Sequence, residues 1–203
     1  MMQRLLTVVL ALGLGAASAC GAAGPAGSTP PAGHTAPPSA TAAMSSSPSA
    51  TAPAARCDTG AWRAAPVTAT RHPAVPPVPV VGAVRTASHP ECGYDRIVLD
   101  ITGPFPGLVI RYVSHVAADP SGTPISMAGR RFLLVTVRPA QAHGVTGATT
   151  ISRQVHVLGY PMLAGWALAG DFEGVVTLAL GLHGAASVRV GDLPGRLYID
   201  VRQ

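Results

Sequence analysis

The sequence contains no lysine and no asparagine, and it has few aromatic side chains. All 14 basic residues are arginines, and the aromatic residues number four Tyr, three Phe and two Trp. So few rings make an aromatic platform for sugars hard to build. The formal net charge of +5 is modest and the arginines are dispersed. This charge distribution argues against a nucleic-acid partner.

Sequence signatures of catalysis are also absent. There is no Gly-x-Ser-x-Gly elbow and no phosphate-binding glycine loop, and the seven histidines are scattered without His-x-x-x-His or Cys-x-x-Cys spacing. We therefore predict no metal site and no cofactor. A glycoside hydrolase would need two opposed carboxylates around a substrate cleft. The adjacent Asp171 and Glu173 are better explained as a strand entry, in which Phe172 is a buried anchor and Gly174 permits a bend. We predict that the protein is not an enzyme.

The N-terminus has the organisation of a secretion signal. Arg4 supplies the positive charge, residues 5–14 are mostly apolar, and Ala17-Ser18-Ala19 gives a small-residue cleavage site. The apolar run is shorter than the roughly 20 residues of a membrane span. We predict a signal peptide at 1–19 whose cleavage exposes Cys20 for lipidation by fatty acyl chains such as palmitate. Lipoprotein signals usually carry Leu where Ala17 stands, so ordinary secretion and a retained anchor remain the alternatives.

The cysteine count agrees with lipidation. Three cysteines, Cys20, Cys57 and Cys92, leave one unpaired in an oxidising compartment. If Cys20 carries lipid, Cys57 and Cys92 can form a disulfide. Closing that loop stabilises a fold by about 4 kcal/mol on the loop-entropy model.

Residues 20–56 are predicted to form a disordered tether. They are mostly Gly, Ala, Pro, Ser and Thr, and all nine acidic residues of the chain lie from Asp58 onward. Such a segment buries too little apolar surface to offset the cost of ordering its backbone. Residues 57–92 follow as a Pro-rich arm, interpreted as a rigid, extended connector clipped to the domain by the disulfide.

Residues 93–203 are predicted to be an all-β domain of about 110 residues, a small β-sandwich or barrel. Ile97, Leu99 and Ile101 would face inward, with Arg96 and Asp100 outward. A short helical turn is expected at 139–144. Six clear strands are expected at 95–101, 108–113, 130–138, 153–158, 173–182 and 196–201, with another at 163–169 or 186–190.

Two of these segments resemble each other. Residues 95–101 and 195–201 both read Arg, three apolar residues, Asp, apolar. If the two strands are antiparallel neighbours in the centred register, Arg96 faces Asp200 and Asp100 faces Arg196, which gives two opposite-charge pairs. We expect these pairs to be exposed and to set register more than stability, at about 0–1 kcal/mol each.

Several separated motifs in this chain resemble a known family. They are VRTASHPECGYDRIVLDITGPFPGLVIRYV (84–113), PAQAH (139–143), DFEG (171–174) and LPGRLYIDV (193–201). Their order is similar to the AMIN-like domain of actinobacterial lipoproteins, over roughly residues 81–203. The lysine-free composition, typical of a GC-rich genome, agrees with that source. The resemblance implies a small β-sandwich related to AMIN domains, which are envelope modules that help to localise other proteins, apparently through peptidoglycan. It implies no catalytic or ligand-binding residues.

Together these features predict a non-enzymatic lipoprotein anchored to the outer face of the cytoplasmic membrane. Its β domain would bind or target peptidoglycan or another wall polymer. The alternative function is a protein-interaction adaptor in an envelope assembly, and a hydrolase is the third and weakest hypothesis. The sequence identifies no ligand-binding residue.

Overall fold

The computed structural model describes residues 57–203. The predicted signal peptide at 1–19, the lipidation site Cys20 and the tether at 20–56 lie outside the described residues. Within the described part, no helix is long and apolar enough to cross a membrane.

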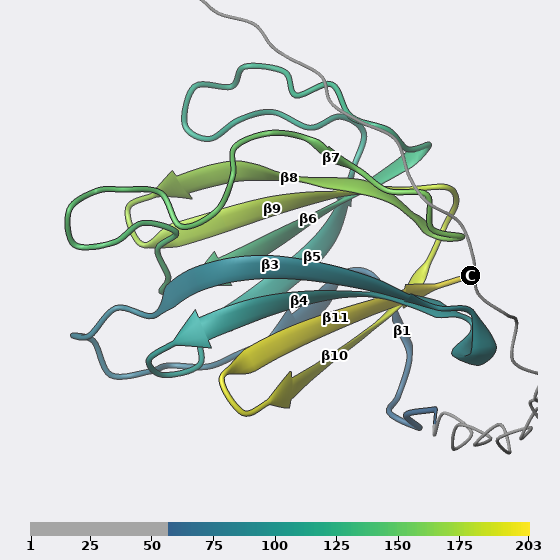
Figure 1. Cartoon of the computed structure of the whole chain (residues 1–203), viewed down its shortest axis with the longest axis horizontal. Coiled ribbons are helices and arrows are strands. Elements are labelled where there is room, and N and C mark those ends of the chain that lie inside the picture. The colour runs from purple at the N-terminus through teal and green to yellow at the C-terminus, as the bar shows by residue number, and fades with distance from the viewer. Residues whose placement is uncertain (1–56) are drawn as a thin grey trace, which may run out of the picture. The chain divides into compact units, whose positions relative to one another are not determined.

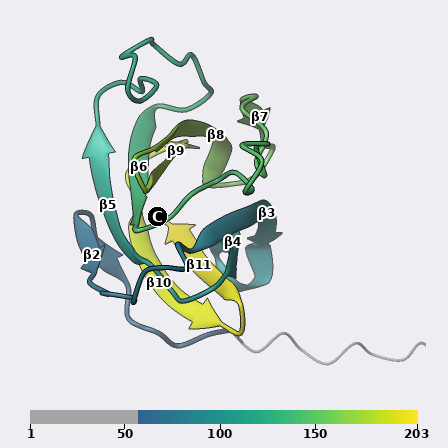
Figure 2. The ribbon, with the colours of Figure 1, turned by 90° about the vertical axis from the view of Figure 1, so that its left-hand side faces the viewer.

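Residues 57–203 form two antiparallel sheets packed face to face, which confirms the predicted all-β sandwich (Figures 1 and 2). One sheet has the order β1-β10-β11-β4-β3, and the other has the order β2-β5-β6-β9-β8-β7. The strands are β1 (Arg63–Ala64), β2 (Val67–Ala69), β3 (Val80–His89), β4 (Tyr94–Thr102), β5 (Gly107–Val113), β6 (Arg131–Arg138), β7 (His156–Val157), β8 (Leu163–Phe172), β9 (Val175–Leu182), β10 (Ser187–Leu193) and β11 (Arg196–Arg202).

The core lies between the sheets and follows the alternation of each strand. Ile97, Leu99 and Ile101 of β4 are buried as predicted, and they pack in one cluster with the inward-facing residues of β5, β6, β9 and β11. Arg96 and Asp100 point to the opposite face of the five-stranded sheet, where both are partly exposed. The two-residue alternation along β4 therefore predicted correctly which of its residues face the core.

The central strands β8 and β9 are buried on both faces, because residues 114–130 cover part of the outer face of their sheet. Val116, Ile125 and Met127 of this loop belong to a second apolar cluster with Ala169 and Ala179. Glycine permits the close approach: a Cβ on Gly181 would lie 1.8 Å from the carbonyl oxygen of Ala128. The loop leaves the part of the sheet near β2 and β5 open.

The structure differs from the sequence-based expectation in several segments. Residues 80–89 of the predicted connector form the ten-residue edge strand β3, and the same arm supplies β1 and β2. Both 163–172 and 187–193 are strands, whereas the 153–158 segment contributes only the two residues of β7. The helical turn expected at 139–144 is absent from the described structure, where this segment has bends and isolated bridges instead.

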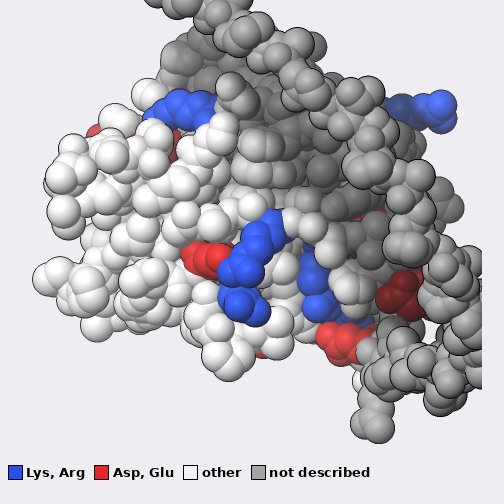
Figure 3. Space-filling model, viewed as in Figure 1, with Lys and Arg blue, Asp and Glu red and all other residues white. Residues whose placement is uncertain are grey.

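The predicted pairing of the two similar segments is confirmed. Strands β4 and β11 are antiparallel neighbours, with Asp100 opposite Arg196 and Arg96 opposite Asp200. The Arg96 Nε–Asp200 Oδ1 distance is 2.5 Å, and the Arg196 Nε–Asp100 Oδ1 distance is 3.6 Å. Figure 3 shows side chains of opposite charge side by side over β3, β4 and β11. The expectation that both pairs are exposed was wrong, since the Asp200 side chain is fully buried.

A disulfide joins Cys57 to Cys92, as the cysteine count predicted, with Cα atoms 5.5 Å apart. Cys92 ends a short 3-10 turn (Pro90–Cys92) between β3 and β4, and Cys57 lies at the start of the described chain. The bond therefore fixes residues 57–62 against the end of the five-stranded sheet.

Removing this bond should destabilise the domain. The paired Cys57→Ser/Cys92→Ser variant is expected to lower the free energy of unfolding by about 4 kcal/mol, because the sulfurs close a long loop in the unfolded chain. Denaturant titration of both proteins measures the difference. A change below about 1 kcal/mol would show that the arm contributes little to the fold.

Candidate functional site

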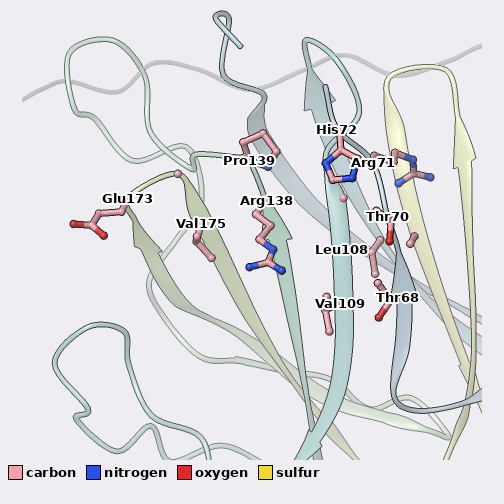
Figure 4. Close-up of a pocket in the computed structure, with 13 residues that line it drawn as sticks. Thr68, Thr70, Arg71, His72, Leu108, Val109, Arg138, Pro139, Glu173 and Val175 are labelled. Carbon is pink, nitrogen blue, oxygen red and sulfur yellow. The ribbon is translucent and has the colours of Figure 1, made fainter. Parts of the chain in front are cut away.

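An open groove crosses the outer face of the six-stranded sheet, at one end of β2, β5, β6 and β9 (Figure 4). Its volume is about 420 Å³, compared with about 290, 310 and 300 Å³ for three other cavities. Binding sites for small ligands typically measure some 300–1,000 Å³. The groove is lined by residues 68–72, 107–109, 138–139 and 173–175.

Gly107 determines how one wall of the groove is built. A Cβ at this position would lie 3.1 Å from the backbone nitrogen of Arg71 and 3.2 Å from the carbonyl oxygen of Ala69. The missing side chain lets the segment after β2 cross the start of β5 and brings Arg71 and His72 to the groove. Arg71 is then fixed in place, because it pairs with Asp192 at 2.7 Å and donates to the carbonyl oxygen of Pro106 at 3.1 Å.

The groove contains positive charge that no acidic group neutralises. Arg138, the last residue of β6, is exposed, and among the described residues its guanidinium has no hydrogen-bond or ion-pair partner. The exposed His72 is likewise unpartnered within 57–203. The carboxylate in the lining belongs to Glu173, and Figure 4 shows this side chain turned away from Arg138. The arrangement suits an anion and offers no facing acid–base pair.

Asp171, the other member of the Asp171/Glu173 pair, lies in a different environment from Glu173. Asp171 accepts a hydrogen bond from the backbone nitrogen of Ala142 at 2.9 Å, and its second oxygen lies 2.7 Å from Nδ1 of His143. Asp171 thus holds the loop after β6 and does not line the groove. Glu173 and Gly174 form the β8–β9 turn, both with positive φ. Gly174 permits the bend as expected, but Phe172 is 48% exposed, so its assignment as a buried anchor was wrong.

A second concentration of charge lies on the outer face of the five-stranded sheet, beneath residues 58–62. Arg96 and Arg189 both bind the buried carboxylate of Asp200, with Arg189 Nε at 2.8 Å. Trp62 covers this cluster, since the Arg189 guanidinium lies 4.6 Å from the centre of its ring. Arg189 also donates to the carbonyl oxygen of Asp58.

The contacts within this cluster shift the pKa of three of its groups. A hydrogen bond from the Gly60 backbone, together with one from the Tyr198 hydroxyl, lowers the pKa of Asp58. Burial, followed by the bond to Asp58, raises the pKa of Tyr198. The hydrogen bond to Asp200 raises the pKa of Arg96. The Asp58 carboxylate therefore stays charged and the Tyr198 phenol stays neutral at neutral pH. The hydrogen bonds of the cluster are made within the protein and hold the arm on the sheet.

The described residues contain no group of three or more His, Cys, Asp or Glu side chains placed to hold a metal ion. His156, on the edge strand β7, instead stacks on Trp166 with ring centres 4.0 Å apart. Its Nε2 is buried and lacks a hydrogen-bond partner within the described part of the chain.

Neutralising Asp200 should destabilise the fold strongly. Asp200→Asn is expected to cost about 3–5 kcal/mol of unfolding free energy, because the buried Arg189 loses its compensating charge. The matched control is Asp192→Asn, which neutralises the carboxylate paired with Arg71. Because Asp192 is more exposed than Asp200, this substitution should cost less than about 1 kcal/mol. Denaturant unfolding of both variants measures the difference, and equal small losses would contradict the assigned role of Asp200.

The fold and these motifs agree with comparisons with known proteins. The model of the AMIN-like domain family matches residues 79–203. Neither the curated proteins nor the solved structures include a match to the chain. The matched segment covers more than half of the sequence and extends from just before β3 to the C-terminal residue, which agrees with the resemblance found in the motifs. The chain therefore belongs to the AMIN-like domain family.

Proposed function

We propose that this protein is a non-enzymatic binding module of the cell envelope, whose β domain binds peptidoglycan or another wall polymer. The single observation that carries the proposal is the open groove on an AMIN-like domain, with the unpartnered Arg138 in its lining. Wall polymers carry many anionic groups, and an exposed guanidinium binds such groups with charge-assisted hydrogen bonds. The absence of a facing acid–base pair in the groove supports binding over hydrolysis.

The proposed location is extracytoplasmic. The Cys57–Cys92 disulfide supports an oxidising compartment. Lipidation of Cys20 would anchor the chain to the outer face of the membrane, since two acyl chains hold a protein stably where a single one does not. Residues 21–56, as a flexible tether, would span about 30–35 Å on average and about 110 Å when fully extended. The domain could then reach into the wall while it stays attached.

Wall binding is tested by sedimentation with insoluble cell wall. A chain that begins at residue 21, purified without lipid, should pellet with isolated wall at low and physiological salt. Retention should fall as salt rises, because exposed charges are screened over about 10 Å at 0.1 M. Bovine serum albumin serves as a non-binding control. A chain that stays in the supernatant at both salt concentrations contradicts the proposed function.

Lipidation is tested separately in producing cells. The full chain should incorporate labelled palmitate and remain with the membrane fraction, whereas Cys20→Ser should lose the label and leave the membrane. Mass spectrometry of the mature N-terminus identifies the modified residue. A wild-type chain that is cleaved after Ala19 but carries no lipid would support ordinary secretion instead.

A second function, as an adaptor for another envelope protein, is favoured by one observation. The ten-residue strand β3 lies at the edge of its sheet, and exposed edge strands can pair with another chain. This edge is partly occupied, because Val81 bonds to Gln141 and Thr150, and the Thr86 carbonyl accepts from Tyr160. Crosslinking in intact cells followed by mass spectrometry separates the two functions by the partner recovered.

A further inference from the structure

We propose that the groove is one end of a two-point site for an anionic polymer, in which Arg138 and Arg111 each bind one carboxylate or phosphate group. The proposal rests on the proposed wall-binding function and names the chemistry that the domain recognises. It starts from the alternation of β5, which places Gly107, Val109 and Arg111 on the same outer face of the sheet.

The register of β5 and β6 fixes the relative positions of the two arginines. Arg138 pairs with Gly107, while Arg111 pairs with Leu134. The two pairs are four residues apart along the strands, which corresponds to about 14 Å. Arg111 is exposed like Arg138, and within residues 57–203 it too has no hydrogen-bond or ion-pair partner.

The surface between the arginines is uncharged and can lie against an extended ligand. Thr68, Val109 and Thr136 are paired across β2, β5 and β6 in a single row. Thr68 is exposed, and Val109 and Thr136 are half-buried. The threonine hydroxyls can donate and accept hydrogen bonds, and the valine offers an apolar contact.

The acidic groups near this face are placed so that they do not cancel the two arginines. Asp192 is already paired with Arg71. Glu173 is turned away from Arg138. Asp119 lies over β8, where its side chain would meet a Cβ on Gly170, and it lines a neighbouring cavity with Val175 and Thr177 of β9. The positive potential is therefore concentrated on the β2–β5–β6 side, where a repeating anion meets two guanidinium groups.

Arginine suits this role better than lysine because its planar fork binds both oxygens of a carboxylate or phosphate. In bacterial walls carboxylates occur on the peptide stems, and phosphodiesters occur on attached anionic polymers. Both sources present the same chemistry to the site, so the experiment must separate them.

The test measures sedimentation of the chain that begins at residue 21 with three wall preparations. These are untreated wall, wall whose carboxylates are amidated with carbodiimide and methylamine, and wall treated with hydrofluoric acid to remove phosphodiester-linked polymers. Arg138→Gln and Arg111→Gln should each weaken binding to untreated wall about tenfold, as the loss of a charge-assisted bond predicts. Arg138→Lys should retain part of the affinity, because it keeps the charge without the fork.

The control variant Arg130→Gln/Arg153→Gln removes two exposed arginines that do not line the groove, and it should bind within about twofold of the wild type. Thermal unfolding confirms that all variants fold. Loss of binding on amidation assigns the carboxylate, and loss after acid treatment assigns the phosphate.

Three results would overturn the two-point site. Wild-type binding that neither treatment reduces excludes an anionic ligand. Arginine variants that bind as well as the control exclude this face, while wall binding itself stands. A wild type that binds no preparation removes both this site and the proposed function.

Discussion

The buried carboxylate of Asp200 is the interaction on which the arrangement of the five-stranded sheet depends. It lies on β11 and binds Arg96 on β4 and Arg189 on β10, so one acidic side chain connects three adjacent strands. A buried charge without partners is very costly. A one-residue slip of β11 would turn Asp200 into the core and separate both arginines from its carboxylate. The ion cluster therefore selects one register, and the apolar residues behind it then fill a single core.

The same cluster explains why the N-terminal arm belongs to the domain. Arg189 reaches Asp58 and lies under Trp62, and the Cys57–Cys92 bond fixes this segment from the other end. The covalent bond limits where the arm can go in the unfolded chain. The ion and ring contacts then select its position in the folded one. The two act together, because the disulfide alone does not specify how the arm packs on the sheet.

The parts of the structure that depend on local pattern could be predicted from sequence. Ile97, Leu99 and Ile101 occupy every second position of their strand, so the pattern predicted that all three are buried. The repeated Arg and Asp positions predicted the β4–β11 register. Burial of Asp200 could not be predicted, because it results from Arg189 and the arm packing over the strand from distant parts of the chain. The groove was missed for the same reason: Arg138 ends a predicted strand, but only the crossing of residues 69–72 over Gly107 builds a wall beside it.

The outer faces of the two sheets differ in how several of their arginines are paired, and this contrast supports the proposed binding surface. On the five-stranded sheet Arg85, Arg96 and Arg189 form ion pairs with carboxylates of the same domain, which neutralise their charge. On the open part of the six-stranded sheet Arg111 and Arg138 have no such partner among the described residues. Unpaired charge adds nothing to folding and repels other positive groups. A fold that pairs Arg85, Arg96 and Arg189 with carboxylates on one face, yet leaves Arg111 and Arg138 unpaired beside a groove on the other, has the charge distribution expected of a surface whose counter-ions come from a ligand.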